Sequence, residues 1–354
     1  MKVLLVKLSS LGDVVHALPV VQDIHLAMPH AQIDWVVEKS FAPLLTCCAG
    51  VHRVIPCEIR RWVKSPLALA TRQEWRAFKA QLQQDAYDAV IDLQGLTKSA
   101  LVARLARLAK GGRRYALANQ TEGSGYEAPT RWVADVAIPI KPSTPAVERS
   151  RMLAALALGY DFQNKPDFGL KFSVDTALTQ HSASEKTVKT IAFVHGTSRA
   201  DKQWPLRDWI ALGKRFNAAG WQVALVHGHV KELETSQEIA QALHENGCAN
   251  ALVWPLLGLA ELTQKLAQCQ GVIGVDSGVS HIAVGLNLPH VQLYNFDTAW
   301  RTGPASGGRQ VSVFAQPAPS VEAVWQAWLA CHETVQVSPA EPTGLFNSFQ
   351  VSAA

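Results

Sequence analysis

Short apolar segments alternate with longer amphipathic segments along most of this 354-residue sequence. The segments with the length and composition of buried strands are residues 3–6, 33–37, 53–56, 89–92, 191–195, 222–227, 251–254, 271–275 and 290–294. Helical patterns occupy residues 12–28, 74–85, 99–109, 146–158, 206–219, 232–245, 259–268, 280–286 and 321–331. A repeated alternation of strand and helix predicts an α/β protein built on parallel sheets.

The alternation pauses between residues 116 and 189 and then restarts, which predicts two Rossmann-like domains joined near residues 170–188. We place the first domain at residues 1–175 and the second at 185–320, a division that suits a chain of this length. A helix at residues 321–333 follows, and the sequence leaves open whether it crosses back to pack on the first domain. Residues 334–354 have the composition of a weakly ordered tail.

Composition excludes several classes of protein. No apolar run approaches the roughly 18 residues of a membrane-spanning helix, and the first residues lack the pattern of a signal peptide. The six cysteines are Cys47, Cys48, Cys57, Cys248, Cys269 and Cys331. None forms a CxxC pair, so buried free thiols are expected rather than disulfides or a metal site. These features predict a cytoplasmic protein.

The positive charge is concentrated at the N-terminal end. Residues 1–115 hold 16 Lys and Arg against 9 Asp and Glu, whereas the whole chain has a net charge of only +4. Such a basic half predicts an anionic partner, which could be a phosphate group, nucleic acid or a membrane surface. No nucleic-acid-binding motif accompanies the charge, so nucleic acid is the least favoured of the three.

Three predicted loops follow strands at the edge of a sheet where Rossmann-like domains bind ligands. The first, "KLSSLGD", offers the backbone amides of Ser9, Ser10 and Gly12 and places Asp13 at a helix start. Asp13 suits either a helix cap, which the residues alone favour, or a general base. No GxGxxG motif is present, so the fingerprint of nicotinamide and flavin binding is absent.

The other two loops suit phosphate binding. In "HGTSRADKQWP", Gly196, Thr197 and Ser198 form a small-residue turn and Lys202 precedes a helix, as in an oxyanion site or an ordinary polar loop. "VDSGVSH" contains Asp276, Ser277 and Gly278 before a helix that carries His281. The serine and glycine amides suit a diphosphate, although the same residues also suit helix capping, and His281 could be a core histidine. No spacing typical of metal ligands occurs with them.

Two basic segments lie in the first half of the chain. "IRRWVK" has Arg60, Arg61 and Lys64 around a tryptophan, outside an obvious helix, and this pattern favours an anion clamp. The second segment, residues 98–114, places Arg104 and Arg107 three apart on a predicted helix. A solvated basic face is the ordinary interpretation of that pattern.

The chain resembles the ADP-heptose:lipopolysaccharide heptosyltransferases of glycosyltransferase family 9 from residue 1 to about residue 331. The matching segments are "KLSSLGDVVHALP", "DWVVEKSFA", "VIPCEIRRWVK", "YDAVIDLQGLTKSA", "AVERSR", "DKQWP" and "VDSGVSHIAVGLN". This resemblance implies a GT-B fold, with two Rossmann-like domains facing across a cleft. It also implies transfer of L-glycero-D-manno-heptose from ADP-heptose to Kdo of Kdo2-lipid A, with inversion and with neither a metal nor a cofactor.

The resemblance further implies a monomeric, peripheral enzyme on the cytoplasmic face of the inner membrane. Two alternatives stay open: a GT-B glycosyltransferase with another nucleotide sugar or acceptor, and a non-catalytic binder of sugar nucleotides or anionic lipids.

Asp13 matches the family's catalytic base, and Lys202 matches the lysine that offsets charge on the leaving ADP. The donor-binding positions are Ser10, Gly12, Thr197, Ser198, Lys202, Glu232, Asp276, Ser277, Gly278 and His281. The acceptor-binding positions are Arg60, Arg61, Lys64 and Lys98.

The sequence departs from the family pattern at three places. The segment that usually contains Ala-Arg-Glu reads "LANQTEGSGYEAP", so one acceptor-binding arginine is missing or displaced. Pro145 replaces a histidine that is common before "AVER", and "YNFDTA" replaces a "YGPTDP"-like strand end. Lys7 has no assigned role.

Overall fold

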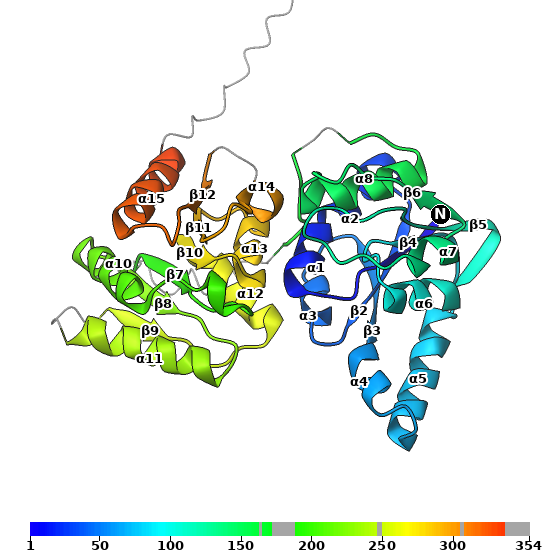
Figure 1. The fold of residues 1–354 in the computed structure, drawn as a ribbon, viewed down its shortest axis with the longest axis horizontal. Helices are drawn as coiled ribbons and strands as arrows, with labels where there is room; N and C mark the ends of the chain where they lie inside the picture. Colours follow the sequence, from blue (N-terminus) through cyan, green and yellow to red (C-terminus); the bar gives the residue numbers. More distant parts are fainter. Residues whose placement is uncertain (163–164, 172–187, 246–249, 305–307, 337–354) are drawn as a thin grey trace, which may run out of the picture.

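The computed structural model describes residues 1–162, 165–171, 188–245, 250–304 and 308–336. Within them, two parallel six-stranded sheets each carry helices on both faces, and the two domains face each other (Figure 1). The predicted α/β class with two Rossmann-like domains is confirmed. Residues 172–187 of the predicted linker, Cys248 and tail residues 337–354 lie outside the described part of the chain.

The first sheet has the strand order β3-β2-β1-β4-β5-β6. Its strands are β1 Lys2–Val6, β2 Gln32–Glu38, β3 Val51–Cys57, β4 Ala86–Asp92, β5 Arg107–Leu117 and β6 Val136–Ile138. The helices of this domain are α1 Leu11–Ala17, α2 Pro19–Ala27, α3 Ala42–Leu45, α4 Ile59–Lys64, α5 Leu69–Leu82, α6 Thr97–Leu105, α7 Pro129–Val133 and α8 Ala146–Leu158. Residues 3–6 of the central strand β1 are fully buried, as expected for a parallel strand covered on both faces.

The second sheet repeats this topology in the order β12-β11-β10-β7-β8-β9. Its strands are β7 Thr190–Val194, β8 Gln222–Leu225, β9 Ala251–Val253, β10 Gly271–Val275, β11 His290–Tyr294 and β12 Gln310–Phe314. Its helices are α10 Leu206–Ala218, α11 Val230–His244, α12 Leu259–Ala267, α13 Gly278–Gly285, α14 Ala299–Thr302 and α15 Val321–Gln336, with a 3-10 turn at Ala200–Lys202. In both sheets the chain order reverses beside the central strand, which is where such folds bind ligands.

Two predicted helices have different bounds in the structure. The helix expected at residues 12–28 is two helices, because Pro19 has no N–H to donate back along α1 and instead begins α2. The helix expected at residues 99–109 ends at Leu105, and Arg107 begins strand β5 beside β4. The predicted pairing of Arg104 and Arg107 on one helix face is therefore wrong.

The segment "IRRWVK" forms helix α4, although the sequence placed it outside a helix. Trp62 is buried and lies edge-on to Trp75 of α5, with ring centroids 5.6 Å apart. Phe78 completes the cluster, with its ring centroid 5.4 Å from that of Trp62. A short helix with weak local signals is thus stabilised by aromatic packing against its neighbour.

The C-terminal helix α15 packs on the second domain, which settles the question left open by the sequence. The indole of Trp328 fills the space beside Gly271, where a Cβ would lie 2.4 Å from the ring. Phe216 of α10 contacts the same indole, with ring centroids 5.5 Å apart. Arg215 also forms an ion pair with Glu322 at 2.6 Å. In the described part of the chain, no helix is both long and apolar enough to cross a bilayer.

The two domains meet where α1 packs against α13 (Figure 1). Glycines make this close approach possible. A Cβ on Gly12 would lie 2.8 Å from the His281 ring, and one on Gly278 would lie 2.7 Å from Leu11 Cγ. The loops "KLSSLGD" and "VDSGVSH" are therefore in direct contact across the domain boundary.

Candidate active site

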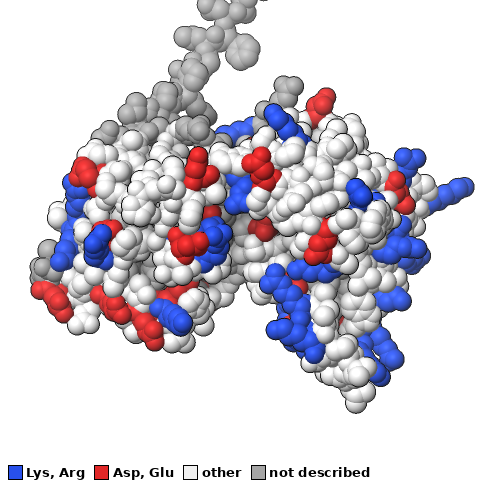
Figure 2. Space-filling view, viewed as in Figure 1, with Lys and Arg blue, Asp and Glu red and all other residues white. Residues whose placement is uncertain are grey.

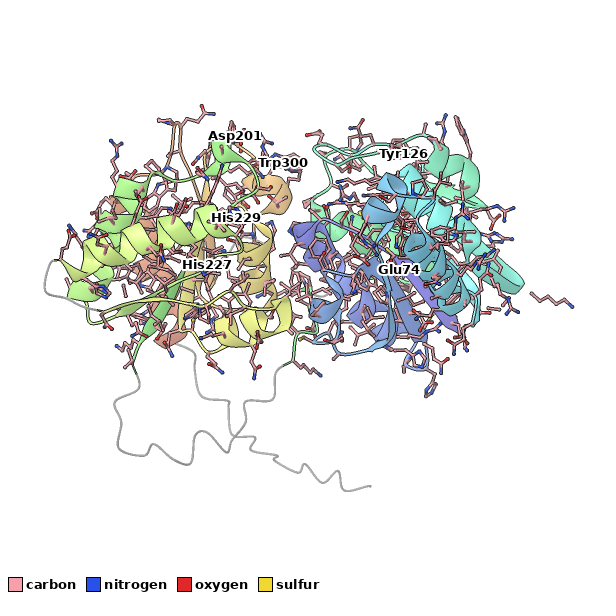
Figure 3. All side chains as sticks on the ribbon, turned by 90° about the horizontal axis from the view of Figure 1, so that it is seen from below. Glu74, Tyr126, Asp201, His227, His229 and Trp300 are labelled. Carbon is pink, nitrogen blue, oxygen red and sulfur yellow. The ribbon has the colours of Figure 1, made fainter. Side chains whose placement is uncertain are left out.

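A cavity of about 510 Å³ lies between the two domains. Its lining includes all eleven donor-side and catalytic positions named from the sequence: Ser10, Gly12, Asp13, Thr197, Ser198, Lys202, Glu232, Asp276, Ser277, Gly278 and His281. His227 and His229 line the second-domain side, where Figure 3 shows them. The three loops predicted separately from the sequence thus form one interdomain site.

Asp13 is the third residue of α1, and Ser10 is the residue that precedes the helix. The Asp13 carboxylate accepts hydrogen bonds from the Ser10 backbone N–H at 3.1 Å and from Ser10 Oγ at 2.8 Å. Its side chain is 38% exposed and faces the cavity. Asp13 therefore contributes to the start of the helix through one carboxylate oxygen, while the other is available for chemistry.

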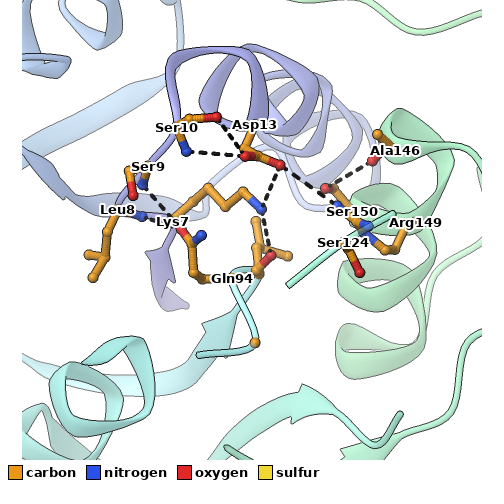
Figure 4. A network of polar contacts seen from close by, with 12 residues as sticks. Lys7, Leu8, Ser9, Ser10, Asp13, Gln94, Ser124, Ala146, Arg149 and Ser150 are labelled. Atoms are coloured by element: carbon orange, nitrogen blue, oxygen red, sulfur yellow. Dashed lines mark hydrogen bonds and ion pairs between the residues drawn. The ribbon is translucent and has the colours of Figure 1, made fainter. Parts of the chain in front are cut away.

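Two cations flank that other oxygen (Figure 4). Lys7 Nζ lies 3.7 Å and an Arg149 guanidinium nitrogen 3.9 Å from Asp13 Oδ1. Burial opposes ionisation of Asp13, but the charge of Lys7 and the bonds from Ser10 outweigh it and lower the pKa of the carboxyl. Asp13 is therefore ionised at neutral pH, the state that a general base requires.

The loop that carries Asp13 is held from the side of the first sheet. Gln94 Oε1 accepts hydrogen bonds from the backbone N–H groups of Leu8 at 3.0 Å and Ser9 at 3.1 Å. Lys7 Nζ donates to the Leu93 carbonyl at 3.0 Å. Gln94 belongs to "YDAVIDLQGLTKSA", so the matching segment contributes to the site through the loop after β4.

Lys202 and Asp276 form an ion pair on the second-domain side, with Lys202 Nζ 2.5 Å from Asp276 Oδ2. His281 Nε2 lies 3.3 Å from the other carboxylate oxygen. Burial would raise the pKa of Asp276, but the contacts with His281 and Lys202 outweigh it and lower that pKa. The ion pair keeps a lysine ammonium at the cavity wall.

His281 also stacks on His16 of the first domain, with ring centroids 4.2 Å apart. Burial and then the neighbouring His281 lower the pKa of His16 well below its usual value, so His16 is neutral near pH 7. The sequence left His281 either in the core or in the site. The structure places it at the domain boundary, in contact with Asp276 and on the cavity wall.

The remaining donor-side residues shape the wall of the second domain. Ser277 caps α13, with its Oγ 3.4 Å from the Ser280 N–H, so the capping interpretation of this loop is correct. The first residues of α13, Gly278 and Val279, also line the cavity, so the unpaired amides of the helix start lie at its wall. Glu232 Oε2 accepts from the Gly228 N–H at 2.6 Å, and its carboxylate fills the space where a Cβ on Gly196 would lie.

The four predicted acceptor-side cations separate into two pairs. Arg60 donates to Ser9 Oγ at 2.7 Å and Lys98 to the same oxygen at 3.5 Å, so both lie beside the Asp13 loop. Arg61 instead pairs with Glu58 and Glu74, and Lys64 is exposed at the end of α4. The structure therefore does not bring Arg61 and Lys64 together with the other two.

Sequence reasoning missed two arginines of the cavity. Arg149 lies in the quoted "AVERSR" segment and is buried, where it donates to Thr121 Oγ1 at 2.9 Å. Arg301 reaches from the second domain to the carbonyl of Gly123, inside the segment that departs from the family pattern. No local sequence pattern marked either residue, because each contacts residues that are far away in the sequence and close only in the folded chain. Among the described residues, no group of three His, Cys, Asp or Glu side chains could hold a metal ion.

Comparison with known proteins identifies the family. The model of glycosyltransferase family 9 (heptosyltransferase) matches residues 75–325. Lipopolysaccharide heptosyltransferase 1 of Pseudomonas aeruginosa is 37% identical over 318 residues, which cover 88% of this chain and 83% of that protein. The protein of the same name from Escherichia coli K12 is 37% identical over 298 residues, which cover 83% of this chain and 88% of that protein.

Two solved structures agree. E. coli heptosyltransferase WaaC with ADP matches with a TM-score of 0.79 and 32% identity, over 92% of this chain and 98% of that one. The same enzyme with ADP-2-deoxy-2-fluoro heptose matches with a TM-score of 0.75 and 33% identity over the same shares. With its two Rossmann-like domains and the interdomain site, this chain belongs to glycosyltransferase family 9, the heptosyltransferases.

Proposed function

We propose that this glycosyltransferase moves L-glycero-D-manno-heptose from ADP-heptose to Kdo of Kdo2-lipid A, in the inner core of lipopolysaccharide. The observation that carries the proposal is the position of an ionised Asp13 in a cavity whose opposite wall holds Lys202 and the start of α13. The names of the relatives and the ADP-heptose analogue bound by the E. coli enzyme support the donor and the pathway.

In this reaction Asp13 removes the proton from the acceptor hydroxyl as its oxygen attacks the anomeric carbon of the heptose. ADP leaves from the opposite face, so the configuration at that carbon is inverted. Negative charge grows on the ADP phosphates as the bond breaks. Lys202 exchanges its contact with Asp276 for these oxygens, and the amides of Ser277 and Gly278 add hydrogen bonds at the positive end of a helix.

The rest of the donor is held by groups on both domains. Thr197 and Ser198 present hydroxyls to the diphosphate, and Glu232 accepts hydrogen bonds from the ribose hydroxyls. Ser10 and Gly12 contact the donor from the first domain. Asp276 and His281 contact the heptose, and the release of Asp276 from Lys202 leaves its carboxylate free for the sugar hydroxyls.

The acceptor approaches from the basic first domain. Arg60 and Lys98, which meet at Ser9, contact its carboxylates and phosphates near Asp13, while Arg61 and Lys64 act farther out. The transfer needs neither a metal ion nor a cofactor. The enzyme works as a monomer, in peripheral contact with the cytoplasmic face of the inner membrane, and nucleic acid is not a partner.

The deciding experiment measures ADP release from ADP-heptose in the presence and absence of Kdo2-lipid A. We expect release that depends on the acceptor and persists with excess EDTA, and a product heavier than the acceptor by one heptose residue. Release with UDP-sugars but not ADP-heptose would support the alternative donor. Donor binding without any acceptor-dependent release would support a non-catalytic binder, and either result contradicts the proposal.

A further inference from the structure

Helices α4 and α5 form an arm, residues 58–82, that projects away from the first sheet (Figure 1). Trp62, Trp75 and Phe78 pack together within the arm and continue the hydrophobic core of the first sheet. The Trp62 indole N–H also donates to Glu74 Oε2 at 2.7 Å, which ties the two helices together. The arm is thus a defined helical hairpin, and the packing between its two helices fixes which residues are exposed at its end.

The end of the arm is apolar and exposed. Every residue from 63 to 70 is exposed. Three of them are large hydrophobic residues: Val63 is 72%, Leu67 77% and Leu69 76% exposed. Single exposed leucines are ordinary on a protein surface, but three within seven residues at the end of a projection form a cluster that needs a partner.

Cations surround this apolar end. The arm contains six Lys and Arg but only two acidic residues, Glu58 and Glu74. Arg61 pairs with both of those carboxylates, and the arm as a whole keeps a net charge of +4. Lys64, Arg72, Arg76 and Lys79 form no ion pair among the described residues. Figure 2 shows Lys and Arg on both sides of the arm and an uncharged end between them.

We propose that the apolar end of the arm inserts into the surface of an anionic lipid bilayer. Leucine side chains gain free energy at the boundary between head groups and acyl chains, and flanking lysines and arginines are attracted to lipid phosphates. An exposed apolar patch that bound another protein would not require an excess of unpaired cations on both of its sides. Because lipid phosphates have the opposite charge, the bilayer is the occupant that the charges favour.

The base of the arm is joined to the active-site loop. Arg60, in α4, donates to Ser9 Oγ, and Ser10 bonds Asp13. The 14 residues of α5 span about 21 Å at 1.5 Å per residue. The arm would therefore act as a spacer that holds the cavity above the membrane, within reach of a sugar on a lipid head group. This purpose rests on the proposed lipid acceptor, whereas the binding surface itself does not.

The test is co-sedimentation of the full chain with vesicles, which requires no substrate. Vesicles of phosphatidylcholine with about one quarter phosphatidylglycerol are compared with vesicles of phosphatidylcholine alone. We expect binding to the anionic vesicles that weakens with salt. The double variant Leu67→Ser/Leu69→Ser should bind at least about tenfold more weakly. The triple variant Arg72→Gln/Arg76→Gln/Lys79→Gln should lose on the order of 100-fold.

Matched controls lie elsewhere on the surface. Leu26→Ser/Leu256→Ser removes two leucines that are 68% and 67% exposed, and Arg104→Gln/Lys110→Gln/Arg113→Gln removes three exposed cations of α6 and β5, outside the arm. Both controls should bind as the unmodified chain does. Equal losses in arm and control variants, or no binding of the unmodified chain to anionic vesicles, would overturn the inference.

A second readout separates this inference from the proposed function. The arm-end variant Leu67→Ser/Leu69→Ser should release ADP normally with an acceptor stripped of its acyl chains, but slowly with the same acceptor embedded in vesicles. If that variant bound vesicles normally, the arm end would not be the membrane-binding surface, even if the enzyme is active. Self-association detected by light scattering and abolished in the variant would instead assign the patch to a second copy of the chain.

Discussion

Lys7 Nζ lies 3.7 Å from Asp13 Oδ1, and the lysine side chain is only 2% exposed. Burial lowers the pKa of Lys7, and the neighbouring Asp13 charge acts in the opposite direction. A positive charge behind the carboxylate stabilises its ionised form, so it sets the pH range in which Asp13 can accept a proton. This contact assigns Lys7 a positioning role, which the sequence left unassigned.

Replacing this lysine should change the pH dependence of turnover. Lys7→Met keeps most of the side-chain volume and removes the charge. Because Lys7 lowers the pKa of Asp13, its loss should raise that pKa and move the acidic limb of the kcat profile to higher pH. The measurement is kcat for ADP release across pH 4–9.

Lys2→Met is the matched control, because Lys2 begins β1, the strand that ends just before Lys7, but pairs with Asp85 at the surface. Its profile should equal that of the unmodified enzyme. If Lys7→Met lowers kcat by the same factor at every pH, Lys7 has a structural role only.

Asp13 itself should be required for turnover but not for donor binding. Asp13→Asn keeps an oxygen that can accept from Ser10 and removes the basic group. A positioned general base contributes about 100-fold to 10,000-fold to a rate, and we expect a loss in kcat of that order. The Kd for ADP, measured by calorimetry, should change by less than about threefold. If Asp13→Asn retained more than one tenth of the kcat, the role of Asp13 would be limited to stabilising the start of α1.

Lys202 should act mainly on the leaving group. Lys202→Met removes the ammonium that lies 2.5 Å from Asp276 Oδ2. Loss of one preorganised group that stabilises transition-state charge costs on the order of 100-fold in kcat. An exposed cation of the same loop, Arg199, pairs with Asp201 and provides the control Arg199→Met. Equal effects of the two substitutions on kcat would mean that the loop contributes only general positive charge.

The contact between Gly12 and His281 makes the domain arrangement testable. A Cβ on Gly12 would lie 2.8 Å from His281 Cδ2, so Gly12→Ala must separate α1 from α13. A displacement of this size at the site should lower kcat/KM by at least about tenfold. Gly258→Ala, whose Cβ would meet its nearest neighbour at an ordinary 3.6 Å, is the control. Unchanged kcat/KM in Gly12→Ala would show that the domains need not meet here during turnover.

Asp92 should make the stability of the fold depend on pH. Burial raises the pKa of this carboxyl to about 6, against an ordinary value of 3.8, although Gln94, Ser99 and Gly95 donate hydrogen bonds to it. A raised folded-state pKa contributes stability below about pH 4 that is lost as the pH rises through 6. Between these two pH limits, Asp92 changes the free energy of unfolding by about 3 kcal/mol.

The variant Asp92→Asn removes this titration. Its free energy of unfolding, measured with urea between pH 4 and pH 8, should rise relative to that of the unmodified chain as the pH increases. A difference that stays constant over this range would contradict the raised pKa of Asp92, whatever the sign of the offset.

Local sequence patterns determined the class of fold and the composition of the site. The alternation of apolar runs with amphipathic segments was sufficient for two parallel sheets, because strand and helix periodicities are properties of consecutive residues. Loops at the carboxyl ends of strands could be recognised for the same reason. Asp13, Lys202 and Asp276 were therefore found without the structure.

Tertiary structure alone decided which side chains act together. Lys7, which follows β1, and Arg149 of α8 flank Asp13, and Arg149 is far from Asp13 in the chain. Arg60 lies at Ser9, while its neighbour Arg61 pairs with Glu58 and Glu74 on the arm. These contacts depend on how helices dock on a sheet and on one another, and the energy of that packing is shared among residues distant in sequence. Hydrophobic periodicity does not encode these contacts, so the charges around Asp13 could be identified only in the folded chain.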